Sequence, residues 1–292
     1  MALSERDIQQ ISGILDVESV HPENDDVRRV HEKASQLPGH RGFKWIGGLA
    51  EEFSEIEARA GSTGLELVTR LLLLASVDGS IWKPACQVPE AICSEFKEEQ
   101  ERIRNEVLTF PSGHYLPGKD AFLKDFSILR GAAMPVYTGI VDTHTALWRR
   151  PLVFGPIGQR LRFLRILLTR PVGTRYFFQH HTHTSLLKRF NEEGWRRTYS
   201  LVAELLKANA DHKGFCGASW FYDPQLKDVS PRLAYLAGYP LLNGADRFHL
   251  GLDDSGSALS KSKTRVKLYE SGKYVPQSYM LVWPKKAMIA NA

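Results

Sequence analysis

Strand patterns and helix patterns alternate through the second half of this sequence. Aromatic and β-branched runs typical of strands occur at residues 174–184, 214–222, 247–250 and 278–283. Amphipathic runs or capping signals typical of helices lie between them, at residues 192–209, from Ser230 onward and at 261–271. This order predicts a layered α/β (α+β) domain.

The first half of the sequence carries helix patterns instead. Apolar residues recur at helical spacing in residues 51–60, 63–77 and 89–108. Residues 110–120 (FPSGHYLPGKD) are rich in Pro and Gly and are typical of a connection. We therefore predict two parts: an acidic, mainly helical region at residues 1–120 and a basic α/β domain at residues 121–292.

Charge is distributed unevenly between these two parts. Residues 1–120 hold 13 Lys and Arg against 21 Asp and Glu, a balance of −8, whereas residues 121–292 hold 25 against 12, a balance of +13. The two balances sum to the net charge of +5. A basic part of this kind suits an anionic partner. Alternatively, the two halves neutralise each other within the molecule.

The N-terminal residues and the cysteines bear on the cellular compartment. The opening sequence MALSERDIQQISGILDVE is polar and acidic and lacks the basic and apolar regions of a signal peptide. The longest purely apolar run, residues 71–75, is far shorter than the roughly 20 residues that span a bilayer. Three cysteines in 292 residues do not suggest a disulfide framework. We expect a cytoplasmic protein without a membrane span.

A run of arginines interleaved with apolar residues covers residues 149–175. It contains Arg149, Arg150, Arg160, Arg162, Arg165, Arg170 and Arg175. One interpretation is a surface helix whose arginine stems cover apolar surface. The other is a surface that faces phosphate groups, because guanidinium groups bind phosphate oxygens in a planar, bidentate way.

Histidines and threonines are concentrated at residues 180–184 (HHTHT). On a strand, His181 and His183 would share one face and His180 would lie on the other. One of the pair can act as a general base, or both can ligate a metal. Candidates for the third ligand that a metal site needs are His144, Asp142, Asp223 and Glu193. The plainer interpretation is a strand whose His and Thr side chains hydrogen-bond with one another.

The predicted helix at residues 192–209 begins among basic residues. Helix N-termini attract anions, because their first N–H groups lack intrahelical partners. We therefore predict a phosphate-binding site here, formed by Arg189, Gly194, Arg196 and Arg197. Glu192 and Glu193 compete in the same turn, since their carboxylates also complement the helix dipole.

A loop with aromatic and polar side chains follows the predicted strand at residues 214–222. Loops after buried strands commonly contact substrates. The candidates for substrate binding are Trp220, Tyr222, Asp223 and Arg232. The alternative is structural, because Asp223-Pro224 is typical of a turn and the aromatic rings fit a core.

The C-terminal stretch KSKTRVKLYESGKYVPQSYMLVWP, residues 261–284, resembles the last helix and strand of the GNAT superfamily of N-acetyltransferases. The resemblance extends at most over residues 174–283 and implies a mixed-sheet domain that binds acetyl-CoA or another acyl-CoA. It also implies that Tyr269 protonates the departing thiolate and that residues 176–209 hold the pantetheine and pyrophosphate. The segments WFYDP, SPRLAYL and YVPQSYMLVWP also resemble a bacterial protein family, which implies no mechanism.

The sequence departs from the GNAT pattern at the phosphate loop. Members of that superfamily place Arg/Gln-x-x-Gly-x-Gly/Ala between this strand and helix, whereas residues 186–194 contain only Gly194. Without further glycines the backbone cannot approach a pyrophosphate as closely. The fold would then accompany a different coenzyme, a coenzyme carried by a protein, or none.

The leading functional prediction is an acyltransferase that moves an acyl group from a CoA or carrier-protein thioester to a small amine or hydroxyl acceptor. His181 or His183 would be the general base, Tyr269 the general acid, and the arginines would hold the carrier phosphates. A second hypothesis is a metal-dependent enzyme built on residues 180–183, although no metal is favoured. A third is a non-catalytic basic protein for an anionic partner; nucleic acid is not favoured, because no zinc-finger, RNP or KH pattern is present. The sequence does not define the oligomeric state.

Overall fold

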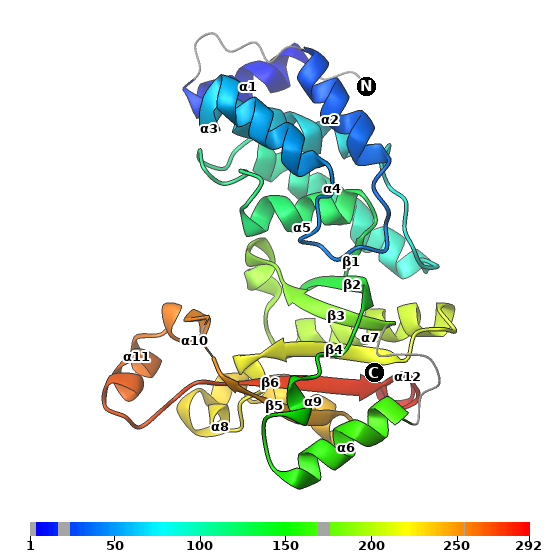
Figure 1. Cartoon of the computed structure of the whole chain (residues 1–292), viewed down its shortest axis with the longest axis vertical. Helices are drawn as coiled ribbons and strands as arrows, with labels where there is room; N and C mark the ends of the chain where they lie inside the picture. Colours follow the sequence, from blue (N-terminus) through cyan, green and yellow to red (C-terminus); the bar gives the residue numbers. More distant parts are fainter. Residues whose placement is uncertain (1–3, 17–23, 169–175, 254) are drawn as a thin grey trace. The chain divides into compact units, whose positions relative to one another are not determined.

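The structure is a computed structural model that describes residues 4–16, 24–168, 176–253 and 255–292 (Figure 1). The chain forms two compact units. The first contains Met1–Thr143 and Thr182–Leu187, and the second contains His144–His181 and Lys188–Ala292. The segment Thr182–Leu187 therefore belongs to the first unit, although the chain on both sides of it belongs to the second.

The first unit is mainly helical. Its helices are α1 (Glu5–Leu15), α2 (Asn24–Ser35), α3 (Leu49–Ser76), α4 (Glu90–Val107) and α5 (Asp120–Leu129). An antiparallel hairpin follows, formed by β1 (Ala133–Pro135) and β2 (Gly139–Thr145). The helices predicted at residues 51–60, 63–77 and 89–108 are confirmed as α3 and α4.

A kink at Gly61 divides α3 into two helical segments. Gly61 has φ 68° and ψ 179°, a backbone conformation that is essentially restricted to glycine. The two helices predicted at residues 51–60 and 63–77 are therefore the two segments on either side of this kink.

Apolar side chains of α3, α4 and α5 form the core of the first unit. Phe53 of α3 contacts Phe122 of α5 edge-on, with ring centroids 5.8 Å apart, and Phe122 stacks on Phe126 at 5.5 Å. Ile103 of α4 is fully buried in the same cluster. Helix α4 thus presents an apolar stripe to the core, as its spacing predicts.

The described part of the second unit is built on four strands, β3 (Phe177–Thr182), β4 (Gly214–Ser219), β5 (Asp246–Leu252) and β6 (Gln277–Pro284). Their order is β3-β4-β6-β5. Strands β3 and β4 are parallel, and α7 (Glu192–Ala208) connects them. A parallel pair requires such a crossover. Strand β6 runs antiparallel to both of its neighbours.

Helices cover both faces of this sheet. Besides α7, the second unit contains α6 (Ile157–Leu168), α8 (Leu226–Val229), α9 (Tyr235–Leu242), α10 (Ser257–Ser260), α11 (Lys263–Glu270) and α12 (Lys285–Asn291). Tyr199 of α7 contacts Phe215 of β4, with centroids 6.0 Å apart. The next residue of β4, Cys216, is buried in a cluster with Phe163 of α6 and Phe248 of β5. Because consecutive strand residues point to opposite faces, α7 and α6 pack on opposite sides.

The predicted fold class is confirmed, since a helical N-terminal part precedes a part with a mixed sheet. The strands predicted at residues 247–250 and 278–283 correspond to β5 and β6. The strand predicted at residues 214–222 is shorter, because β4 ends at Ser219 and Trp220–Tyr222 form a short 3-10 helix. The strand predicted at residues 174–184 is shorter, because β3 begins at Phe177 and ends at Thr182. Residues 174 and 175 lie outside the described residues.

Candidate functional site on strands β5 and β6

A row of polar side chains crosses three strands of the second unit. Ser219 of β4 is the register partner of Tyr279 of β6, and Tyr279 is in turn the partner of His249 of β5. Directly paired residues of antiparallel strands point to the same face. The rings of His249 and Tyr279 are in contact, with centroids 5.1 Å apart. The guanidinium carbon of Arg247 lies 5.4 Å from the centre of the Tyr279 ring.

Two further side chains are tied to this row by hydrogen bonds. The backbone N–H of Gln277 donates to Asp223 Oδ2 at 3.0 Å, and Gln277 Oε1 lies 2.8 Å from His249 Nε2. We refer to Asp223, Arg247, His249, Gln277 and Tyr279 as the His249 cluster. All five residues belong to the second unit.

The hydrogen bond to Gln277 favours one tautomer of the neutral His249 ring. A carbonyl oxygen can only accept, so Nε2 of His249 carries the proton and donates to Gln277 Oε1. The amide of Gln277 is oriented by its own Nε2, which donates to the carbonyl oxygen of Val275 at 3.4 Å. In the neutral ring this leaves Nδ1 as a lone-pair acceptor, which is the form of imidazole that acts as a general base.

Gln159 of α6 fixes the backbone of His249. Its Oε1 accepts the N–H of His249 at 2.8 Å, and its Nε2 donates to the carbonyl oxygen of His249 at 3.3 Å. The side-chain amide therefore takes the place of a neighbouring strand beside β5. The register of β5 also shifts between His249 and Gly251, where Gly251 has φ 110°. Bulges of this kind re-aim side chains at functional sites.

Asp223 is the acidic member of the cluster and is almost fully buried, with 2 % of its surface exposed. Its Oδ1 accepts the N–H of Gln225 at 2.9 Å, and its Oδ2 accepts the N–H of Gln277. Burial raises the pKa of Asp223 above its ordinary value, and the two N–H groups and the charge of Arg247 oppose this rise only in part. A perturbed carboxyl group beside an imidazole and a guanidinium is typical of functional sites.

The phenol and the guanidinium of the cluster are perturbed as well. Burial, and then the negative charge of Asp223, raise the pKa of Tyr279. Burial lowers the pKa of Arg247. The raised pKa favours the protonated phenol of Tyr279. The cluster combines a lone-pair base with a protonated hydroxyl group next to it.

The structure brings two of the predicted substrate-binding residues to this cluster. Asp223 is one of its members, and the carbonyl oxygen of Tyr222 accepts Arg247 Nη1 at 3.2 Å. Trp220 is buried and packs under the guanidinium of Arg265, 4.6 Å from the ring centre. Arg232 is exposed on the segment that precedes α9 and lies outside the cluster.

The predicted phosphate-binding residues lie at the start of α7. The N–H of Gly194 donates to the side chain of Asn191, the N-cap residue, at 2.9 Å, so this donor is already used within the helix. Arg196 pairs with Glu192 at 2.9 Å. Arg197 is exposed and Arg189 is half-buried. The turn therefore offers guanidinium groups to an anion rather than a glycine-rich backbone cradle.

The predicted histidine and tyrosine residues are scattered. His180 is buried against Trp195, with ring centroids 4.5 Å apart, and His181 is half-buried near the end of β3. Tyr269 lies on α11 with 49 % of its surface exposed, outside the His249 cluster.

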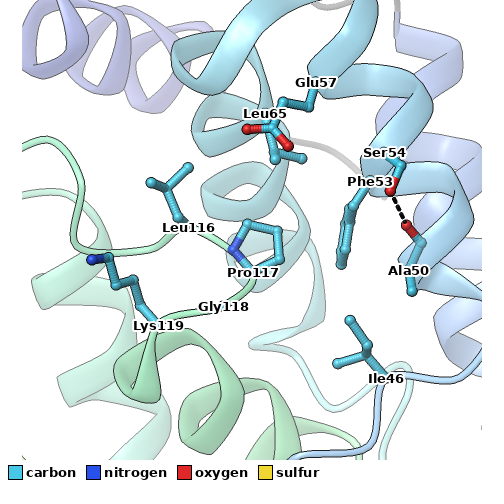
Figure 2. Close-up of a pocket in the computed structure, with 10 residues that line it drawn as sticks. All are labelled: Ile46, Ala50, Phe53, Ser54, Glu57, Leu65, Leu116, Pro117, Gly118 and Lys119. Atoms are coloured by element: carbon cyan, nitrogen blue, oxygen red, sulfur yellow. Dashed lines mark hydrogen bonds between the residues drawn. The ribbon is translucent and has the colours of Figure 1, made fainter.

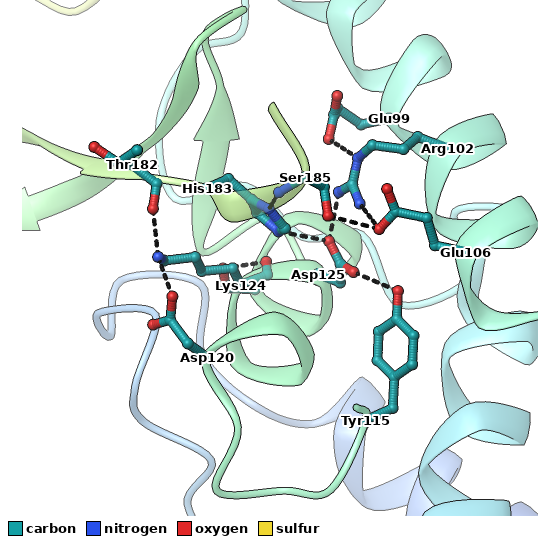
Figure 3. Close-up of polar contacts among 11 residues, drawn as sticks. Glu99, Arg102, Glu106, Tyr115, Asp120, Lys124, Asp125, Thr182, His183 and Ser185 are labelled. Carbon is teal, nitrogen blue, oxygen red and sulfur yellow. Dashed lines mark hydrogen bonds and ion pairs between the residues drawn. The ribbon is translucent and has the colours of Figure 1, made fainter. Parts of the chain in front are cut away.

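His183 does not lie on the strand with His181, because β3 ends at Thr182. It is fully buried in the first unit (Figure 3). Its Nε2 donates to Asp125 Oδ1 at 3.0 Å, and its Nδ1 accepts the backbone N–H of Ser185 at 3.2 Å. Both ring nitrogens are engaged, so the ring has no free lone pair for acid–base chemistry.

Asp125 is the centre of a buried ionic network that anchors this histidine. It accepts Arg102 Nη2 at 2.5 Å and the hydroxyl of Tyr115 at 3.1 Å. Burial alone would raise the pKa of Asp125, but the charge of Arg102 and the hydrogen bonds from Arg102 and His183 hold it well below its usual range. Ser185 adds a hydrogen bond to Glu106 at 2.7 Å. We interpret the network as the anchor of Thr182–Leu187 in the first unit.

The first unit also contains an open pocket of about 490 Å³ (Figure 2). Its apolar lining is formed by Ile46, Ala50, Phe53, Leu65, Leu116 and Pro117. Glu57 and Lys119 contribute the charged groups, and the hydroxyl of Ser54 donates to the carbonyl oxygen of Ala50. The lining thus combines an apolar surface with one carboxylate and one ammonium group.

Two of the proposed third ligands for a metal already have partners. Asp142 accepts the N–H of Phe43, and the ring of His144 contacts Tyr176 and His212. Within the described ranges, the structure contains no group of three or more His, Cys, Asp or Glu residues arranged to hold a metal ion.

Sequence reasoning missed Arg247, His249, Gln277 and Tyr279. A signal for part of this set is present, because Arg247 and His249 alternate with Phe248 and Leu250 and so fall on one face of a strand. Their partner Tyr279 is 30 residues away, and only the register of β5 and β6 reveals it. Comparison of the chain with protein-family models, with curated proteins and with solved structures yields no match.

Proposed function

We propose that this protein is an acyltransferase that moves an acyl group from a CoA or carrier-protein thioester to a small amine or hydroxyl acceptor. The observation that carries the proposal is the point at which the pairing of β3 with β4 ends. Their parallel register joins residues 177–179 to residues 214–216, whereas within the second unit β3 continues through His180 and His181, and β4 continues to Ser219.

Strand edges that are no longer paired with each other can bind an extended ligand with amide groups. Such a ligand adds to a sheet by main-chain hydrogen bonds, and the pantetheine arm of coenzyme A and of carrier proteins contains two amides. Ligands of α/β sheets also bind outside the carboxyl ends of parallel strands. An arm that followed β4 would end near Ser219, the register partner of Tyr279.

The His249 cluster supplies the acid and the base for the transfer. His249 Nδ1 takes the proton of the attacking amine or hydroxyl as that atom forms its bond to the thioester carbon. Tyr279 gives its phenolic proton to the sulfur as the carbon–sulfur bond breaks, and the proton taken by His249 returns to the phenolate through solvent. Neighbouring strands are about 5 Å apart, so His249 lies roughly 10 Å from β4, with Tyr279 of β6 between them. The acceptor would bind over the face of the sheet that carries these side chains.

Arg189, Arg196 and Arg197 are the residues that would hold the phosphates of the donor, by charge-assisted contacts from their guanidinium groups. The N–H of Gly194 already donates to Asn191. Phosphate binding at this turn would therefore rely on side chains. A carrier protein is an equally suitable donor, because it is acidic and would meet the basic part of the chain. The free cysteines Cys86, Cys93 and Cys216 support a cytoplasmic location.

An assay of thiol release tests this proposal. The full chain is given acetyl-CoA, a longer acyl-CoA or an acylated carrier protein together with a mixture of small amines and alcohols. We expect release with at least one donor, and a loss of about a hundredfold or more in His249→Gln. His40→Gln, at an exposed histidine of the first unit, is the matched control and should keep full activity.

Two outcomes would contradict the proposal. The first is the absence of thiol release above the uncatalysed rate with every donor. The second is full activity in His249→Gln together with loss of activity in His181→Gln, which would move the base to the end of β3.

A further inference from the structure

Helix α6 exposes a continuous apolar stripe. Ile157, Leu161, Leu164 and Leu168 are 73 %, 61 %, 39 % and 73 % exposed. Their spacing of four, three and four residues places them on one face of the helix. The opposite face is buried, with Phe163 in the core and Gln159 bonded to the backbone of His249. The stripe therefore faces away from the sheet.

Two residues before α6 also expose apolar side chains. Val153 is 67 % exposed and Trp148 is 44 % exposed. Arg160 holds Val153 next to the helix, because its Nη2 donates to the carbonyl oxygen of Val153 at 2.9 Å and its Nε to that of Gly155 at 3.2 Å. The exposed indole matters, since Trp is enriched where proteins meet the interface of a bilayer.

Arginines lie on both sides of the stripe. At about 100° of rotation per residue, Arg160 falls on one side and Arg165 on the other, with Arg162 beyond Arg165. Arg162 and Arg165 are exposed. The sequence contains no Asp or Glu from residue 143 to residue 191, whereas it contains nine Lys and Arg there. Two of these, Arg170 and Arg175, lie outside the described residues.

The chemistry of this surface indicates what would bind it. The aliphatic stripe favours an apolar medium, and the arginines on both sides of it favour anions at the edge of that medium. The surface of a bilayer with anionic phospholipids supplies both at the right depths. A helix of this length, roughly 18 Å, lies in that interface. Among the described residues, no helix combines the length and apolarity needed to cross a bilayer.

We propose that α6 is an interfacial helix that binds the second unit to anionic phospholipid membranes. Ile157, Leu161, Leu164 and Leu168 enter the boundary between headgroups and acyl chains. Arg162 and Arg165 bind the lipid phosphates. This proposal does not depend on the acyltransferase activity, because it uses only the outward face of α6.

Vesicle sedimentation with the full chain tests the proposal. Vesicles of phosphatidylcholine alone are compared with vesicles that also contain phosphatidylglycerol, at low and at high salt. We expect binding to the anionic vesicles at low salt, weaker binding at high salt, and little binding to phosphatidylcholine. The triple variant L161Q/L164Q/L168Q should reduce the partition coefficient about tenfold or more.

Further variants separate the contribution of the apolar stripe from that of the arginines. Leu242→Gln replaces a leucine of α9 that is 88 % exposed, and it should bind as the unchanged protein does. The double variant R162Q/R165Q should lose most of the preference for anionic over neutral vesicles, by about tenfold or more. Arg160 and Gln159 stay in place in every variant, so that the loop and the backbone of His249 keep their contacts, and melting curves verify the fold.

The proposal is overturned if the unchanged protein fails to sediment with anionic vesicles at low salt. It is also overturned if L161Q/L164Q/L168Q binds them equally well. A third contrary result is self-association in sedimentation velocity that L161Q/L164Q/L168Q abolishes, without any vesicle binding, because the stripe would then be covered by a second copy of the chain.

Discussion

His249 of β5 and Tyr279 of β6 are direct register partners, and their rings lie 5.1 Å apart. This pairing places an imidazole and a phenol side by side at the end of the sheet where β4 ends at Ser219. The two backbone bonds from Gln159 and the ring bond to Gln277 hold His249 in that position. The arrangement gives each of these neighbours a testable role.

Gln159→Leu should loosen His249 without touching its ring. The change leaves the N–H and the carbonyl oxygen of His249 without their side-chain partner, which costs about 1–3 kcal/mol of stability. Because Gln159 acts by positioning His249, we expect kcat for thiol release to fall while KM changes little. Urea melts and steady-state kinetics measure both effects. Gln225→Leu, at an exposed position, is the control; an equal fall of kcat in both variants would contradict the assignment.

Acidification should destabilise the first unit. Burial alone would raise the pKa of Glu66, but the N–H groups of Gly113 and Tyr115 and the side chain of Arg70 bring it below its ordinary value; the pKa of Asp125 is lowered too. A folded pKa below the unfolded one stabilises the fold above the unfolded pKa of about 4, and this contribution is lost as pH falls through the folded pKa.

Urea titrations followed by circular dichroism from neutral to acidic pH check this expectation. The midpoint should decrease once the pH falls below about 4. A midpoint that stays constant or rises on acidification would show that these carboxylates are not stabilised in the folded state.

Asp125→Asn should weaken the buried network that holds His183. Removing the carboxylate leaves Arg102 with less compensation for a buried charge, a change that typically costs about 3–5 kcal/mol. The measurement is the free energy of unfolding in urea. Asp228→Asn, which removes the same charge at an exposed site on α8, should change it by less than about 0.5 kcal/mol. Equal effects of the two substitutions would argue against the network.

Gly61→Ala should destabilise α3, although space for the methyl group is open. The φ of 68° and ψ of 179° are strained for alanine by about 1–3 kcal/mol. Gly13→Ala is the matched control, because Gly13 lies within α1 and its methyl group would also meet open space. There we expect a gain of roughly 0.5–1 kcal/mol. Equal melting temperatures of the two variants would contradict the left-handed backbone conformation of Gly61.

Local patterns predict most of the elements, because amphipathic spacing and turn residues act over a few residues. The helices α3 and α4 and the strands β4, β5 and β6 follow from such patterns. The end of β3 does not, because a contact between His183 and Asp125, 58 residues apart, draws the chain after Thr182 into the first unit.

The candidate site shows the same limit. Asp223 stands out in the sequence, because it follows a strand and precedes a proline. His249 and Tyr279 become a pair only through the register of β5 with β6, and their position relative to Ser219 depends on β6 lying between β4 and β5. The sequence motif around Tyr269 predicts that residue as the general acid, but Tyr269 lies on α11, outside the His249 cluster.

In the proposed reaction, Tyr279 delivers the proton to the departing sulfur. Tyr279→Phe and Tyr269→Phe remove the same hydroxyl group from two positions, and single-turnover thiol release with the active donor compares them directly. We predict that Tyr279→Phe slows release by about a hundredfold or more, while Tyr269→Phe, at a residue 49 % exposed on α11, leaves it unchanged. Normal release in Tyr279→Phe would contradict the account.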